Sequence, residues 1–298
     1  MHGPAAATKI SASVAPFRLP ATLSRAVAVA SAPGSIEVLG GLHDGERSTN
    51  AVIRIDLRSG SVTVPARLPV AVHDAAGGLV AGVPTVLGGG NSAEVAAIQQ
   101  ADAAGTGIVG RLPFPSSDVV AAATDRGLVL VGGYDGRRTL GQVLLVTGPD
   151  RVERIGTLAV SVRYPAVVAT GSGTAQRVLV IGGESGGVAT DIVQQVDPAT
   201  GNTTVVGHLP APRTQASALL LAGSVFVFGG ASGGRTGATV FADVLRWNPL
   251  TRTFAPAGSL PYPVADAAFV TPDGHTGYLV GGETPSRVDT TIIVVPRG

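Results

Sequence analysis

Six polar residues recur at one position of a repeating pattern and could together bind or transform a ligand. Each lies six residues after a leucine that proline follows in five copies and alanine in one. These six positions hold Arg25, Asp74, Asp118, Tyr164, Gln215 and Asp266. Arginine and carboxylate side chains make charge-assisted hydrogen bonds to sugars, carboxylates and peptides. We therefore expect these residues to bind a polar ligand, with the nearby Arg163 and Arg213 as the first choices.

A histidine beside an aspartate, at His73 and Asp74, is the one pair that suggests acid–base catalysis, because a carboxylate can set the tautomer of an imidazole. Neighbouring residues of a strand point to opposite faces, however, so such a pair is usually not a working one. Tyr134 and Arg138, in a polar loop, are further candidate contacts. The alternative is that all these side chains only solvate a channel entrance. The histidines lack the spacing of metal ligands, and we expect no metal and no cofactor.

The elements that position these residues follow from an internal repeat of 44 to 52 residues. A double glycine closes a short apolar run six times, at Gly40-Gly41, Gly88-Gly89, Gly132-Gly133, Gly182-Gly183, Gly229-Gly230 and Gly281-Gly282. The leucines keep step with it, at Leu19, Leu68, Leu112, Leu158, Leu209 and Leu260. Two markers that hold one register six times indicate a repeat architecture.

Each period contains four short apolar segments separated by turn residues, which predicts four antiparallel strands and an all-β, six-bladed β-propeller forming a single domain over 1–298. The expected blades are roughly 21–68, 69–112, 113–158, 159–209, 210–260, and 261–298 plus 1–20. The last period lacks a fourth strand, and the segment "KISASVAPFRLP" resembles one. We therefore predict that the N-terminal strand completes the C-terminal blade, which would remove an exposed sheet edge.

Composition restricts the function further. The 298 residues carry a net charge of only +1, so nothing indicates binding to nucleic acid or to an anionic membrane surface. No apolar run is long enough to insert into a membrane. The chain has no cysteine, which excludes disulfides and thiolate chemistry and fits either side of a membrane. We expect a monomeric domain. We also favour an exported protein whose signal or anchor is absent from this chain.

The pattern resembles the kelch repeat, and in particular bacterial kelch-like proteins, across essentially the whole chain. The match is best at Gly229-Gly230 followed by Asn248-Pro249, Thr251 and Phe254. The aromatic position is not kept in other repeats, and the third repeat lacks the Asp-Pro turn. The resemblance implies a propeller that binds a protein segment or a glycan at the channel mouth without catalysis. The alternative that it implies is a small-sugar-modifying enzyme similar to kelch-like mutarotases or epimerases.

Overall fold

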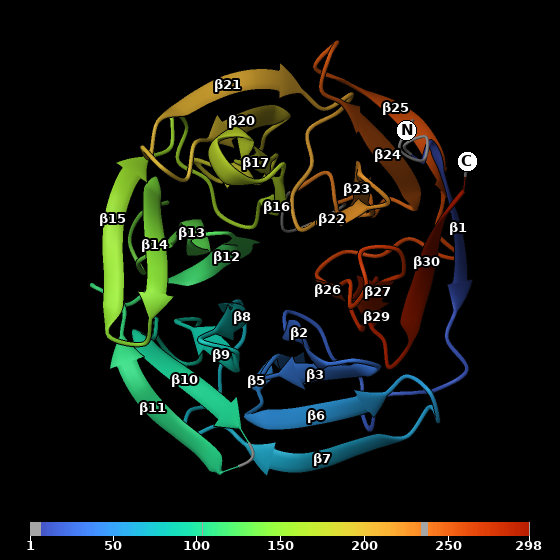
Figure 1. Cartoon of the computed structure of the whole chain (residues 1–298). Helices are drawn as coiled ribbons and strands as arrows, with labels where there is room; N and C mark the ends of the chain where they lie inside the picture. Colours follow the sequence, from blue (N-terminus) through green and yellow to red (C-terminus); the bar gives the residue numbers. More distant parts are fainter. Residues whose placement is uncertain (1–6, 103, 234–237, 298) are drawn as a thin grey trace.

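The protein is a six-bladed β-propeller in which every blade is a four-stranded antiparallel sheet (Figure 1). The computed structural model describes residues 7–102, 104–233 and 238–297. The parts of the expected blades at residues 1–6, 103, 234–237 and 298 lie outside the described residues. The predicted fold class is confirmed, and only one short 3-10 helix, Gly173–Ala175, occurs among the described residues.

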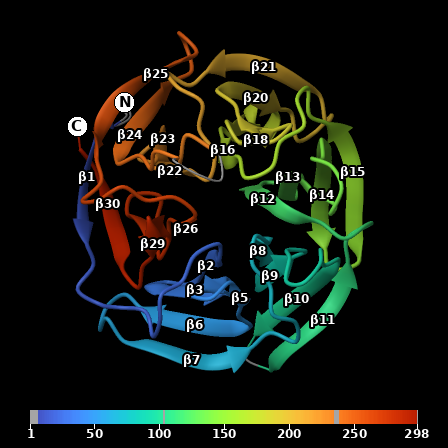
Figure 2. The same cartoon turned by 180° about the vertical axis from the view of Figure 1, so that it is seen from behind.

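The strands of a blade follow one another outwards from the central axis, as the two opposite views show (Figures 1 and 2). Blades one and two contain β2 (Val27–Ala32), β3 (Ser35–Leu39), β6 (Ala51–Asp56) and β7 (Val62–Arg67), then β8 (Ala76–Val80), β9 (Val83–Leu87), β10 (Ala97–Asp102) and β11 (Gly105–Arg111). Blades three and four contain β12 (Ser117–Thr124), β13 (Gly127–Tyr134), β14 (Gln142–Gly148) and β15 (Arg151–Thr157), then β16 (Ala166–Thr170), β17 (Arg177–Ile181), β20 (Ile192–Val196) and β21 (Thr203–His208). Blade five contains β22 (Ser217–Leu221), β23 (Ser224–Phe228), β24 (Asp243–Asn248) and β25 (Thr253–Ser259).

The sixth blade joins the two ends of the chain, as the sequence predicts. It consists of β26 (Ala268–Val270), β27 (Gly277–Val280), β30 (Thr291–Arg297) and β1 (Lys9–Val14). Strand β1 pairs antiparallel with β30, from Lys9 opposite Arg297 to Val14 opposite Ile292. Ile10 is buried between blades five and six, so the closing strand also contributes to the core. The backbone groups of β30 are thereby paired on both sides.

Small residues occupy the innermost strands because the strands converge on the axis. Gly77 in β8 illustrates the crowding, since a Cβ atom there would lie 2.3 Å from Cγ1 of Val27 in the neighbouring blade. Alanine and glycine are poor strand formers, so close packing outweighs intrinsic propensity at these positions. The larger apolar residues of the described ranges pack between adjacent blades in six separate clusters.

The double glycines connect each blade to the next. The second glycine of each pair donates its backbone N–H to a carbonyl of the following blade, as Gly133 does to Val162 at 2.9 Å. The first glycine approaches the same carbonyl so closely that a Cβ atom on Gly132 would lie 2.2 Å from the oxygen of Val162. Both glycines have positive φ, at 67° and 104°, so the site requires residues without a side chain.

Among the described residues, three two-stranded hairpins follow double glycines on the face that carries the loops between the second and third strands of the blades. They are β4 (Leu42–His43) with β5 (Arg47–Ser48), β18 (Glu184–Ser185) with β19 (Val188–Ala189), and β28 (Glu283–Thr284) with β29 (Ser286–Arg287). We call this face the upper face. No helix in the described part of the chain is long and apolar enough to cross a membrane.

Candidate functional site

The six residues that recur after the leucines form a closed ring at the upper mouth of the central channel. We call this set the mouth ring; it comprises Arg25, Asp74, Asp118, Tyr164, Gln215 and Asp266. All six have a left-handed backbone, with φ between 52° and 59°. Each donates its N–H to the carbonyl of the ring member in the preceding blade, at 2.8 to 3.1 Å, so six hydrogen bonds encircle the channel. Non-glycine residues rarely adopt this conformation, and finding it six times identifies the ring as a built feature of the fold.

The mouth ring lines a cavity of about 140 Å³ that extends into the channel. Its six side chains form the polar end of this mouth cavity. Below them the wall consists of small and apolar residues of the inner strands, among them Ala28, Gly77 and Ala121, together with Phe269. Ring residues Arg25, Tyr164 and Gln215 also face a second hollow above the ring, on the upper face. The ring therefore separates an apolar channel wall from a polar entrance.

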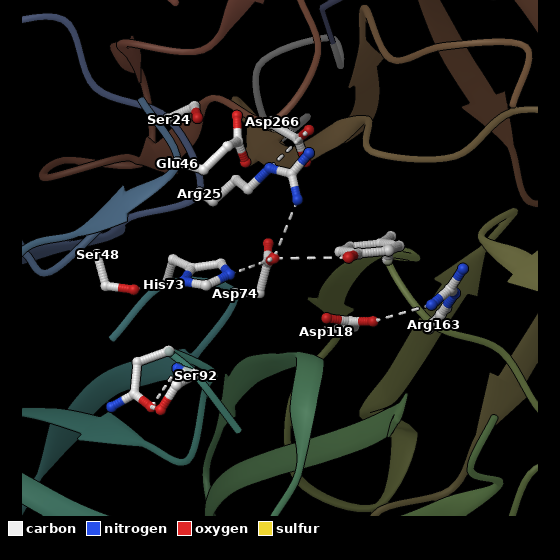
Figure 3. A network of polar contacts seen from close by, with 12 residues as sticks. Ser24, Arg25, Glu46, Ser48, His73, Asp74, Ser92, Asp118, Arg163 and Asp266 are labelled. Carbon is white, nitrogen blue, oxygen red and sulfur yellow. Dashed lines mark hydrogen bonds and ion pairs between the residues drawn. The ribbon is translucent and has the colours of Figure 1, made fainter. Parts of the chain in front are cut away.

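Arg25 lies at the centre of the acidic side chains at this mouth (Figure 3). Its Nη1 donates to Oδ2 of Asp74 at 3.2 Å, and its Nε donates to Oε1 of Glu283 at 3.4 Å. The same Nε lies 3.4 Å from Oδ2 of Asp266. Burial disfavours its charge, but Asp266, Asp74 and Glu283 outweigh that effect and raise the pKa of Arg25. The guanidinium is therefore a permanent cation at the ring.

The environment of the ring favours the protonated form of its three carboxyl groups. The side chains of Asp74, Asp118 and Asp266 are only 5% or 6% exposed. Burial raises the pKa of Asp118 to about 7, and the negative charge of Asp74 adds to the effect. Burial also raises the pKa values of Asp74 and Asp266, against the opposing effect of Arg25. Buried like charges cannot all ionise together without cost, so the three groups titrate as a set.

Arg163 occupies the other side of the mouth and connects the ring to the upper face. Its Nε donates to Oε1 of Glu184 at 3.0 Å, and its Nη1 lies 3.5 Å from Oδ2 of Asp118. The guanidinium lies 5.3 Å from the ring centroid of Tyr134 and 5.4 Å from that of Tyr164. Burial lowers the pKa of Arg163, but the hydrogen bond to Glu184 and the charges of Glu184 and Asp118 together outweigh burial and raise it. Its side chain remains 28% exposed, so part of it can still meet a ligand.

His73 and Asp74 face one another, although strand alternation argues against it. Nε2 of His73 lies 3.7 Å from Oδ2 of Asp74, and Nδ1 is 2.8 Å from Oγ of Ser48 (Figure 3). The left-handed backbone of Asp74 breaks the alternation and turns its carboxylate towards the histidine. Burial, followed by the charge of Arg25, lowers the pKa of His73. A neutral imidazole therefore lies beside the ring at neutral pH.

Arg213 and Arg138, both in the predicted set, line neither the mouth cavity nor the hollow above the ring. Arg213 is 3% exposed, and its guanidinium binds both carboxylate oxygens of Asp243 at 2.8 and 3.0 Å and the carbonyl of Gly229. It also stacks on Phe241, 4.1 Å from the ring centroid. These contacts give Arg213 a role in holding blade five together. Arg138 is 80% exposed, pairs with Asp135 and lines a separate hollow.

Two carboxylates of the mouth, Glu184 and Glu283, were not singled out from the sequence. Each follows a double glycine directly, and each pairs across a β-bridge with the residue before a ring member, namely Arg163 and Ala265. Tyr134 has the equivalent place in blade three, opposite Ser117. The residue directly after each of these double glycines is therefore held beside the mouth. A glutamate at that position of the repeat is the sequence signal that could have identified Glu184 and Glu283.

Among the described residues, no group of three or more His, Asp or Glu side chains has an arrangement that could hold a metal ion. No protein-family model matches the chain, and no curated protein matches it either. The class of protein is therefore defined by the fold: a six-bladed β-propeller, an architecture that commonly serves as a binding scaffold.

Proposed function

We propose that the protein is a non-catalytic binding module whose mouth ring binds the terminal sugar of a glycan. The observation that carries this proposal is the convergence of Arg25, Tyr164, Gln215 and three buried carboxyl groups on one small cavity. Concave sites with a few fixed polar groups suit small polar ligands. The repeat pattern supports placing the chain among kelch-like propellers, whose known roles are consistent with binding.

A protein segment fits this mouth less well than a sugar does. Protein-binding surfaces are centred on accessible aromatic or arginine anchors. In the described ranges, the exposed large hydrophobic residues are all aliphatic, and most lie on outer strands, as Val64 and Ile108 do. The arginine at the centre of the ring has a side chain only 20% exposed. The groups able to make specific contacts are therefore recessed, where a sugar hydroxyl can reach them more easily than a folded surface can.

A glycan-array screen tests the proposal. The wild-type protein should bind a restricted set of glycans, and Gln215→Ala and Arg163→Ala should each weaken that binding by about tenfold, the value of one lost hydrogen bond to a polar or charged group. Arg151→Ala provides the control, because Arg151 is exposed at the start of the outer strand β15. Binding that responds equally to all three substitutions, or no binding to any glycan, would refute the proposed function.

One observation favours a second function at the same place, an enzyme that interconverts sugar anomers. Asp118, whose pKa is raised to about 7, could exchange a proton near neutral pH. Opening a sugar ring breaks the bond between the anomeric carbon and the ring oxygen; the anomeric hydroxyl loses a proton to a base and the ring oxygen gains one from an acid. Anomeric exchange measured by NMR should then be accelerated by the wild type and not by Asp118→Asn.

A further inference from the structure

The mouth cavity is lined by more acidic than basic side chains. Its charged lining residues, in the part of the chain that the structure describes, are one arginine, Arg25, and three aspartates, Asp74, Asp118 and Asp266. The side chains of all three aspartates are more than nine-tenths buried. Arg163 reaches Asp118 only at 3.5 Å and donates its hydrogen bonds to Glu184 instead. One cation at the cavity therefore faces three carboxyl groups.

One of these carboxyl groups has an oxygen without a hydrogen bond. Oδ2 of Asp266 is buried and has no hydrogen-bond partner among the described residues. Arg25 lies close to it, but its Nε donates towards Glu283 and its Nη1 towards Asp74, so the approach to Asp266 is an ion-pair contact only. A buried acceptor that lacks a donor is unfavourable, and it usually indicates a missing partner. Asp266 lines the mouth cavity, where such a partner would have to lie.

We infer that the mouth ring takes a sugar bearing a free amino group, whose ammonium ion lies between Asp118 and Asp266 and donates to Oδ2 of Asp266. The inference rests on the proposed function and narrows its ligand class. An ammonium ion has three donors and one positive charge, so it supplies the missing hydrogen bond and favours the ionised form of the carboxyl groups beside it. The sugar hydroxyls would meet Gln215 and Tyr164, and the apolar face of the sugar ring would lie against the alanines of the inner strands.

Other cations suit this cavity less well. The carboxyl groups do not have an arrangement that could hold a metal ion in the described part of the chain. A guanidinium is already present, and a second one would have to share the same acceptors with Arg25 at the ring. A primary ammonium is compact and can rotate its three donors towards acceptors that are already fixed. A small cavity with carboxylates at its polar end therefore favours an amine.

Calorimetric titration at pH 7 with three related sugars tests the inference. Glucosamine carries the ammonium group, N-acetylglucosamine replaces it by a neutral amide, and glucose replaces it by a hydroxyl. Glucosamine should bind at least about tenfold more tightly than either of the others, the ratio expected for one charge-assisted hydrogen bond in a buried site. This comparison uses only the wild-type protein, so it does not depend on the folding of any variant.

Single substitutions test which residues cause the preference for glucosamine. Asp266→Asn and Asp118→Asn preserve shape but remove a carboxyl group that can ionise beside the ammonium ion, and each should bring the ratio of glucosamine to glucose affinity down towards one. Asp150→Asn is the control, because Asp150 is exposed in the turn between β14 and β15. Thermal unfolding of each variant verifies that it is folded. An unchanged ratio in both ring variants would overturn the inference.

Failure of the inference can be told apart from failure of the proposed function. If glucose or N-acetylglucosamine binds as tightly as glucosamine and Gln215→Ala weakens that binding, the preference for an amine is wrong while the glycan site stands. If no sugar binds in the titrations or on the array, the proposed function and the inference are both wrong.

Discussion

Arg25 donates its backbone N–H to the carbonyl of Asp266 at 2.9 Å, which closes the mouth ring between the first and last blades. Their side chains also meet, with Nε of Arg25 3.4 Å from Oδ2 of Asp266. The polar groups proposed to bind a ligand are thus part of the same closed hydrogen-bond circuit that joins the six blades. Some substitutions at the mouth should therefore reduce both stability and ligand binding, whereas others should affect only one of the two.

Closure of the propeller by β1 predicts unequal effects of two substitutions in that strand. Ile10 is buried against blade five, so Ile10→Ala should lower the free energy of unfolding by about 2 to 4 kcal/mol. Val14 is 40% exposed at the other end of the strand, and Val14→Ala should lower it by less than about 1 kcal/mol. Denaturant unfolding measures both. Equal losses would show that β1 does not hold the sixth blade to the fifth.

Replacing a glycine of the double-glycine pair should cost more stability than replacing a glycine in an ordinary turn. Gly34→Ala introduces a side chain at a φ of 75° in open space, which costs about 1 to 2 kcal/mol. Gly132→Ala adds a clash with the carbonyl of Val162, which must withdraw from its hydrogen bond with Gly133. The free energy of unfolding should therefore fall by about 1 kcal/mol more than in Gly34→Ala, the typical net value of a hydrogen bond. A smaller loss in Gly132→Ala would contradict this role.

Much of the fold was predictable, because the two sequence markers report on backbone geometry. The double glycines have positive φ and lie where two blades approach closely, and the leucines are buried just before each new blade begins. Both markers therefore recur in all six repeats although the loop sequences differ. Side-chain partners at the mouth were less predictable. That Arg213 would be buried against Asp243 depends on a contact between loop and strand, and the approach of His73 to Asp74 depends on a left-handed residue. Neither follows from spacing alone.

The two arginines first chosen from the sequence should behave differently. Arg213 is buried against a carboxylate partner that is 43% exposed, so Arg213→Ala should lower the free energy of unfolding by about 2 to 3 kcal/mol through lost packing and lost charge-assisted hydrogen bonds. Arg163 is partly exposed at the mouth, and Arg163→Ala should reduce stability by only about 1 kcal/mol, comparable to a partly solvated ion pair, while weakening ligand binding. Thermal unfolding combined with glycan binding distinguishes them. Two variants of equal stability would contradict the structural role assigned to Arg213.

The raised pKa of Asp118 predicts that stability falls as the pH rises from about 4 to 7. In that interval the unfolded chain has lost the proton, whose ordinary pKa is about 3.9, while the folded protein retains it. One such proton changes the free energy of unfolding by up to about 1.4 kcal/mol per pH unit. Below this interval both states are protonated and the contribution of Asp118 is fully present.

Urea unfolding at a series of pH values measures this slope. The slope depends on the groups that face Asp118, which are Asp74, Arg163, Tyr164 and its neighbour Ser117. Asp118→Asn should flatten it between pH 4 and 7, whereas the exposed control Asp150→Asn should leave it as in the wild type. A slope in Asp118→Asn that equals the wild-type slope would show that Asp118 does not retain its proton in the folded protein over this interval.

A crystal structure of the protein with a bound sugar that the glycan array selects tests ligand binding at the mouth ring most directly. Binding at the ring predicts electron density for that sugar in the mouth cavity, in contact with Gln215, Tyr164 and the ring carboxylates. Density for the sugar in the separate hollow beside Arg138, with the mouth ring unoccupied, would contradict it.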